Sequence, residues 1–178
     1  TRFMHHLEQQ GKLDRYLERL PDDKALAERR AAQIGLTSPE LCVLLAYSKI
    51  NLYEELLASD FPEDAYLQKL LLSYFPQPLP QRFPEQISQH RLHREIIATV
   101  ATNQAINHGG LSVYLLGEET GLSAPEIMRA FLVAWEVFGM QQWWAEIEAL
   151  DSQMNTALQI TLFIEAQKLM ERATRWLL

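Results

Sequence analysis

The sequence is poor in the residues that build disulfides and phosphate-binding loops. Its one cysteine, Cys42, cannot form a disulfide within the chain. Because Cys42 lies in the apolar run 41–45, we expect it to be a small buried hydrophobic residue in a reducing cytosol. Among seven glycines only Gly109 and Gly110 are adjacent, and the sequence has neither a G-x-G-x-x-G turn nor a Walker-type loop. We therefore expect no nucleotide cofactor within this chain.

Positive charge and long apolar runs are also scarce. The 16 lysine and arginine residues face 23 aspartate and glutamate residues, which gives a formal net charge of −7. Because nucleic-acid affinity depends largely on cations that release counterions from phosphates, we expect no nucleic-acid partner. No uninterrupted apolar run approaches the roughly 20 residues that a membrane span needs. We therefore expect no membrane partner and a cytoplasmic location.

Helical periodicity, by contrast, runs through most of the sequence. The 48% hydrophobic and 22% charged residues are typical of a packed globular domain. No strictly alternating run bounded by hairpin turns occurs, so we predict an all-α fold, an irregular bundle of about nine helices. The predicted helices cover residues 3–19, 22–33, 37–58, 64–74, 85–108, 111–120, 121–138, 141–150 and 152–178.

Capping residues and prolines set the predicted helix ends and domain boundaries. Thr37 and Glu40 have the spacing of a capping box, and Asp151 is the predicted cap of the last helix. Segment 75–84 carries four prolines that each remove an amide donor, so it cannot continue a helix. We expect one helical domain over residues 1–178, cut from a larger chain, with a subdivision at segment 75–84.

Some patterns imitate functional sites. His90 and His93 lie three residues apart on a predicted helix, but no second pair or suitably spaced carboxylate completes a metal site, so we expect no metal. Residues 111–138 imitate a helix-turn-helix, yet the span holds four glutamates against one arginine, a net charge of −3. Its second helix is mostly apolar, so we expect a buried core helix rather than a DNA reader. We also expect Trp135, Trp143 and Trp144 at core or interface positions rather than in contact with a ligand.

One polar stripe on the predicted helix 85–108 has two interpretations. Glu95, Thr99, Asn103 and Asn107 recur every four residues, so they share one side of the helix. The stripe is either an ordinary solvent-facing surface or a polar contact surface for another part of a larger protein. Threonine and asparagine are weaker helix formers than lysine, glutamate or glutamine, which favours the second interpretation.

Several strings in the sequence resemble the C-terminal region of the large bacterial NAD-specific glutamate dehydrogenases. The resemblance covers essentially the whole chain in the same order, with local departures at His93, where the family pattern has an arginine, and after Gly110. The strings that carry it are 35–41 (GLTSPEL), 43–50 (VLLAYSKI), 74–76 (YFP), 90–99 (HRLHREIIAT), 118–121 (EETG), 144–151 (WAEIEALD) and 171–178 (ERATRWLL).

This resemblance implies a parent enzyme that oxidatively deaminates L-glutamate to 2-oxoglutarate and ammonia with NAD. The dinucleotide-binding fold and the catalytic lysine of the family lie upstream, so no catalytic, cofactor-binding or metal-binding residue carries over to this chain. The chain would then pack on the catalytic domain, assemble a homo-oligomer or transmit regulation, and its partner would be the remainder of the parent chain. The alternative is an independent helical interaction module without enzymatic activity.

Overall fold

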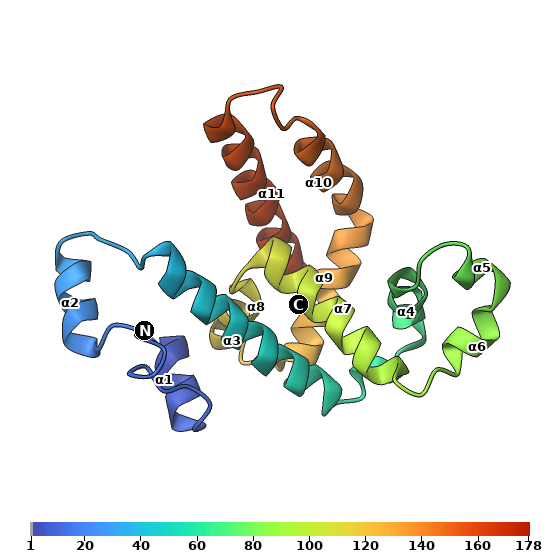
Figure 1. Ribbon diagram of the computed structural model, residues 1–178, viewed down its shortest axis with the longest axis horizontal. Helices are drawn as coiled ribbons and strands as arrows, with labels where there is room; N and C mark the ends of the chain where they lie inside the picture. Colours follow the sequence, from blue (N-terminus) through green and yellow to red (C-terminus); the bar gives the residue numbers. More distant parts are fainter. Residues whose placement is uncertain (1) are drawn as a thin grey trace. The chain divides into compact units, whose positions relative to one another are not determined.

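The computed structural model describes residues 2–178, and within that range it is 74% helical and contains no strand. Eleven α-helices are present, nine of them with seven residues or more (Figure 1). The predicted all-α fold is therefore confirmed. The α-helices are α1 Arg2–Gln9, α2 Asp23–Ala31, α3 Ser38–Leu57, α4 Gln68–Tyr74, α5 Leu79–Arg82, α6 Pro84–Ser88, α7 His93–Gly109, α8 Ser112–Thr120, α9 Ala124–Val137, α10 Met140–Ala149 and α11 Thr156–Leu177, with the 3-10 helices η1 Phe61–Glu63 and η2 Ala65–Leu67 between α3 and α4.

The chain divides into two compact units inside α3. The first unit ends at Asn51 and the second begins at Leu52. Segment 75–84, where we expected a subdivision, lies within the second unit. Two of its four prolines, Pro80 and Pro84, occupy first-turn positions of the short helices α5 and α6, where the missing amide donor costs no intrahelical hydrogen bond.

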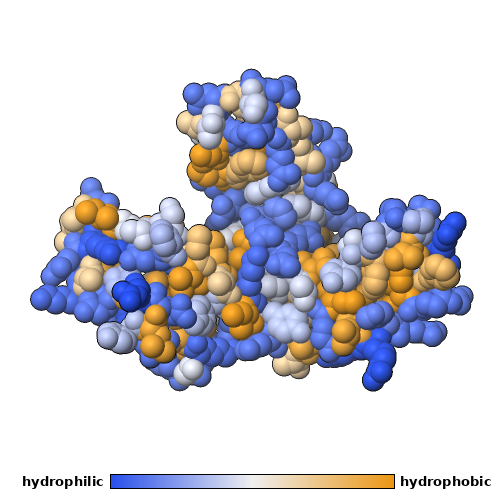
Figure 2. All heavy atoms as spheres, viewed as in Figure 1, coloured by the Kyte–Doolittle hydropathy of each residue, from blue (hydrophilic) through white to orange (hydrophobic). Residues whose placement is uncertain are grey.

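Large apolar side chains reach the surface of both units. In Figure 2 the aliphatic ones appear as orange areas between the blue hydrophilic ones. Tyr16 and Leu17 are 90% and 74% exposed in the first unit, and Trp176 and Val137 are 84% and 72% exposed in the second.

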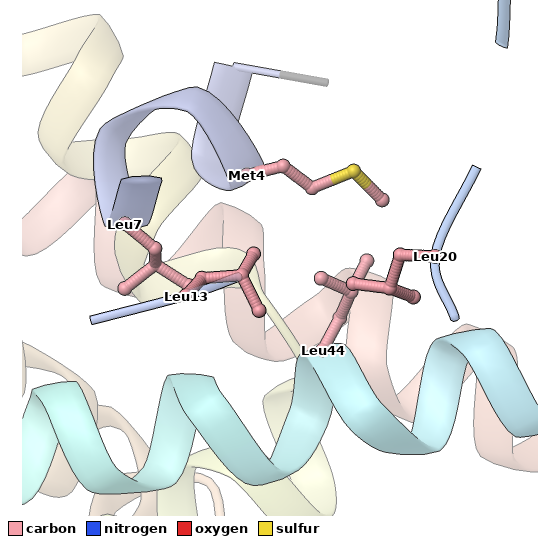
Figure 3. Close-up of a cluster of buried hydrophobic side chains, with 5 residues drawn as sticks. All are labelled: Met4, Leu7, Leu13, Leu20 and Leu44. Carbon is pink, nitrogen blue, oxygen red and sulfur yellow. The ribbon is translucent and has the colours of Figure 1, made fainter. Parts of the chain in front are cut away.

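The core of the first unit is a cluster of five buried side chains, Met4, Leu7, Leu13, Leu20 and Leu44 (Figure 3). The predicted helix 3–19 is wrong in its second half, because α1 ends at Gln9. Gly11 follows with a φ of +68°, and the Lys12 and Leu13 amides both donate to the Leu7 carbonyl. This turn brings Leu13 back against Leu7, which a continuous helix could not do.

The corner before α3 has the Glu40 half of the predicted capping box. The Thr37 amide donates to the Glu40 carboxylate at 2.7 Å, and Arg29 donates to the same carboxylate at 2.7 and 3.0 Å. The Arg29 guanidinium, together with the Thr37 amide, lowers the pKa of Glu40 to about 2. Cys42, two residues further on, is exposed, so its predicted burial is wrong. An apolar run in a helix points to all sides, and of residues 41–45 only Leu44 is buried.

Two predicted helix boundaries in the second unit are also wrong. The predicted helix 85–108 is broken into α6 and α7, because the His90 imidazole accepts the Leu92 amide and the His90 carbonyl accepts from the His93 ring in a turn. Asp151 does not cap the last helix. Ser152 has a φ of +62°, and the Asn155 side chain accepts the Ala157 amide at 2.8 Å, so α11 begins four residues later than predicted.

Helix α7 is the centre of the second unit and packs against α4, α8, α9 and α11. Small buried residues on α7, among them Ala101, Ala105 and Gly109, let these helices approach closely. A Cβ atom at Gly109 would lie 3.2 Å from the Phe131 ring of α9. The prediction that α9 is a buried core helix is confirmed, because Ile127, Met128, Phe131, Leu132, Ala134 and Trp135 are all buried.

Candidate interaction cleft

A cleft of about 1000 Å³ lies within the second unit, between α4, α7, α9 and α10. Its volume is at the upper end of the range of small-molecule pockets. Its buried and half-buried lining residues include three aromatic rings, which we call the bottom of the cleft. Its exposed lining residues are mostly carboxamides and carboxylates, which we call the rim. The residues used below are Lys69 from α4, Asn103, Asn107 and His108 from α7, Trp135 and Glu136 from α9, and Gln141, Gln142, Trp144 and Glu148 from α10.

Three aromatic rings meet at the bottom of the cleft. The centroid of the His108 ring lies 4.5 Å from that of Trp135 and 4.6 Å from that of Trp144, while the two indoles are 6.1 Å apart. Trp135 is a core residue, as predicted, with 8% of its surface exposed. Trp143 is 59% exposed and does not line the cleft, so it is not part of the core. The aromatic cluster fixes the relative positions of α7, α9 and α10.

The His108 ring is held in one orientation and in its neutral form. Its Nδ1 atom donates to the Gln104 carbonyl at 2.8 Å. Burial lowers the pKa of His108, and the hydrogen bond to Gln104 and the negative charge of Glu148 oppose this shift. Because desolvation disfavours the imidazolium, the ring is neutral at pH 7 and packs as an aromatic side chain.

Acidification is expected to destabilise the chain through His108. The folded-state pKa lies below the ordinary value of 6.5, so the unfolded chain binds this proton more readily. The neutral ring therefore makes its full contribution to the free energy of unfolding above pH 6.5. This contribution decreases as the pH falls from 6.5 through the folded-state pKa. Urea denaturation at a series of pH values should show that the free energy of unfolding of the wild type decreases with falling pH. The slope should be smaller for His108→Gln. Identical slopes in the two proteins would contradict the expectation.

The structure divides the predicted polar stripe into two halves. Asn103 and Asn107 line the cleft, whereas Glu95 and Thr99 lie outside it. The Thr99 hydroxyl donates to the Glu95 carbonyl at 2.7 Å, which is an ordinary intrahelical bond. Within residues 2–178 the carboxamides of Asn103 and Asn107 make no hydrogen bond. Two unpaired carboxamides therefore face the cleft one helical turn apart.

The rim of the cleft carries more negative than positive charge. Glu136 accepts from the Lys69 ammonium and the Tyr66 hydroxyl, and these hydrogen bonds, that from Lys69 first, lower the pKa of Glu136. Lys69 is the one lysine or arginine on the cleft surface of the described chain, and it is engaged in this pair. Glu148 is exposed and has no lysine or arginine partner among the described residues. The rim therefore offers one uncompensated carboxylate.

The cleft combines residues that sequence reasoning found with residues that it missed. Asn103 and Asn107 are singled out by their helical spacing, whereas Trp135 and Trp144 are predicted at core or interface positions and not as ligand contacts. Lys69, Glu136 and Glu148 were missed, because they come from three helices that meet only in the folded unit. The one sequence signal for Glu148 was its position one turn after Trp144, which puts both on one side of α10.

Neither a candidate metal site nor a membrane-spanning helix occurs among the described residues. No group of three or more histidine, cysteine, aspartate or glutamate side chains is placed to hold a metal ion anywhere in residues 2–178. His90 and His93 contribute to the turn before α7 instead. In the same range, none of the helices has both the length and the hydrophobicity to cross a membrane.

Comparison with known proteins gives the family of the chain. A family model described as glutamate dehydrogenase, C-terminal, matches residues 33–178. A protein named NAD-specific glutamate dehydrogenase from Pseudomonas aeruginosa is 46% identical over 178 residues, which is 99% of this chain and 11% of that protein.

Two further relatives carry the same name. The protein from Halomonas elongata is 37% identical over 178 residues, 99% of this chain and 11% of that protein. The protein from Mycobacterium tuberculosis is 36% identical over 167 residues, 93% of this chain and 10% of that protein. The chain thus spans about a tenth of the length of the curated relatives that it matches. Together, the family match and these identities show that the chain belongs to the glutamate dehydrogenase C-terminal family.

Proposed function

We propose that this chain is a helical domain of a large NAD-dependent glutamate dehydrogenase and that it has a structural or assembly role without an active site of its own. The parent enzyme would convert L-glutamate and NAD to 2-oxoglutarate, ammonia and NADH. The observation that carries the proposal is the extent of the similarity. Relatives with this enzyme name match 99% of the chain, yet the chain covers 11% of their length.

The surface of the chain supports a role within a larger assembly. Tyr16, Leu17, Val137 and Trp176 are each more than 70% exposed, and large aromatic and aliphatic side chains at such exposure are costly in water. Contact with the catalytic part of the parent chain would cover them. The same surface is compatible with a homo-oligomer, and a cytoplasmic location is part of the proposal.

The proposal is tested by the activity of the isolated chain and of the full-length enzyme. The full-length enzyme should form NADH from glutamate and NAD, whereas residues 1–178 alone should neither form NADH nor bind NAD. Glutamate-dependent NADH formation by the isolated chain would refute the absence of an active site. A gene that encodes these 178 residues alone, without a dinucleotide-binding segment, would instead favour the independent interaction module.

Within the polar stripe, Asn103 and Asn107 are the proposed contact residues, and they support a paired prediction. In the isolated chain the double change to alanine should leave stability unchanged or raise it, since alanine gains up to about 0.7 kcal/mol of helix propensity per site. In the full-length enzyme the same change should weaken assembly or lower activity, because each lost hydrogen bond to a partner is worth about 1 kcal/mol. The measurements are thermal unfolding of the chain, and activity and oligomer size of the enzyme.

Thr99→Ala is the matched control for this pair. Thr99 lies on the same side of α7 but outside the cleft, and its hydroxyl bonds within the helix. If Thr99→Ala lowers the assembly or activity of the full-length enzyme equally, the whole stripe from Glu95 to Asn107 contacts the partner. A full-length enzyme that tolerates both changes would leave only the solvent-facing interpretation of the stripe.

A further inference from the structure

We propose that the cleft between α4, α7, α9 and α10 binds an extended segment of the enzyme chain outside these 178 residues, and that a lysine or arginine of this segment pairs with Glu148. The inference rests on the proposed function, since the occupant comes from the remainder of the large enzyme. Two features of the cleft lead to it, the spacing of its free carboxamides and its charge. A third observation is the length of chain outside the structure.

The two free carboxamides match the repeat of an extended backbone. Asn103 and Asn107 are four residues apart on α7, a rise of about 6 Å along the helix axis. Every second peptide group of an extended chain recurs after about 6.6 Å and points to the same side. A carboxamide carries both a donor and an acceptor, as a peptide group does. A segment that lies along α7 can therefore pair with both asparagines through alternate peptide groups.

The α10 side of the cleft provides further amide groups of the same kind. Gln141 and Gln142 line it, and the Gln142 side chain donates to Glu146 at 2.7 Å, which leaves its carbonyl oxygen available as an acceptor. Between these amides and the asparagines lie the indoles of Trp135 and Trp144. Polar groups on two sides and an apolar bottom suit a peptide, whose backbone needs hydrogen bonds and whose side chains need apolar contact.

The charge of the cleft selects a basic segment. Glu136 is neutralised by Lys69, and His108 is neutral, so the charge of Glu148 remains for a ligand. Trp144 lies one turn before Glu148 on α10, so a cation that reaches the carboxylate also comes near the indole. An anionic ligand would meet an acidic rim whose lysine is already engaged.

The source of the segment follows from chain length and net charge. A second copy of this chain would bring a further −7 to an acidic rim, which electrostatic repulsion disfavours. The relatives place about nine-tenths of their length outside the matched region, because the match covers 10 to 11% of each. The enzyme therefore has ample chain outside this domain to supply a basic, extended segment.

Site-specific photo-cross-linking in the full-length enzyme tests the proposal. Asn107 is replaced by the photo-reactive amino acid p-benzoylphenylalanine, the enzyme is irradiated, and the adducts are mapped by mass spectrometry. We expect adducts to one segment outside residues 1–178 that carries a lysine or arginine. The same replacement at Thr99, which lies outside the cleft on the same helix, is the control and should not give this adduct.

Charge reversal provides the second measurement. Glu148→Lys should lower the yield of the Asn107 adduct about tenfold, the change that 1.4 kcal/mol produces. Glu85→Lys is the matched control, because Glu85 is exposed on α6 in the same unit and does not line the cleft, and it should leave the yield unchanged. Both variants carry the same net charge, so general electrostatic repulsion cannot explain a difference between them.

The proposal is wrong if the Asn107 probe reacts only within residues 1–178, if it labels a co-purifying small molecule, or if it gives no adduct. It is also wrong if Glu85→Lys lowers the yield as much as Glu148→Lys does. Glutamate-dependent NADH formation by the same preparation separates the two levels of inference. If the enzyme is active but the cleft is empty, only the proposal of a bound segment is wrong. If the full-length protein lacks this activity, the proposed function is wrong.

Discussion

Replacing Phe131 with alanine is expected to lower the free energy of unfolding by about 3–5 kcal/mol, as for other fully buried phenylalanines. Phe131 is 2% exposed and lies on α9 against α7, where its ring fills the space beside Gly109. The ring also stacks on Trp135, with 6.1 Å between centroids. Its removal leaves a cavity between two helices that cannot collapse, because Gly109 contributes no side chain to fill it.

Phe138→Ala is the matched control for this prediction. Phe138 follows α9 and is 43% exposed, so its truncation removes the same atoms but creates no internal cavity. Urea denaturation should give a loss for Phe138→Ala that stays within about 1 kcal/mol. Equal losses in the two variants would show that α9 does not pack on α7 as the structure has it. The Phe131 variant should also disturb the cleft, since Trp135 and His108 at its bottom depend on the position of α9.

A cap that lies beside its helix in the sequence can be predicted without the fold, although the cap predicted at Asp151 is wrong. Asp22 caps α2, and Ser123 with Glu126 forms the capping box of α9, because each bond joins residues three apart in the sequence. These patterns require no knowledge of the fold. The long apolar face of α9 was equally readable, since six buried residues repeat at helical spacing within one segment.

The sequence fails where a turn is determined by longer-range packing. Gly11 is a local stop signal after α1, but the apolar spacing continues to Leu17, so the local pattern alone does not decide where the helix ends. The turn at Gly11 is stabilised by the packing of Leu13 and Leu20 on Leu44, which is distant in sequence. The cleft shows the same limit. Asn103 and Asn107 were visible as a stripe, but only the packing of α4 and α10 places them in a cleft beside Glu148.

The junction between α3 and α7 depends on Arg94, and its loss is the second large effect that we expect. The Arg94 Nη2 atom donates to the Leu57 carbonyl at 2.8 Å and to the Ser59 carbonyl at 3.1 Å. Its Nη1 atom donates to Glu63 of η1. The last carbonyls of a helix have no intrahelical partner, so this guanidinium acts as the C-terminal cap of α3.

Arg94→Ala should therefore lower the free energy of unfolding by about 2 kcal/mol, because two partly buried carbonyls lose a charged donor. Arg94→Lys should recover less than half of this loss, since one ammonium cannot reproduce a planar fork that donates to two carbonyls and a carboxylate at once. Arg91→Ala is the control, because Arg91 is exposed three residues earlier and should change stability by less than about 0.5 kcal/mol. Urea denaturation of the three variants measures these differences. Full rescue by lysine would mean that the positive charge alone, and not the geometry of the guanidinium, holds the end of α3 against α7.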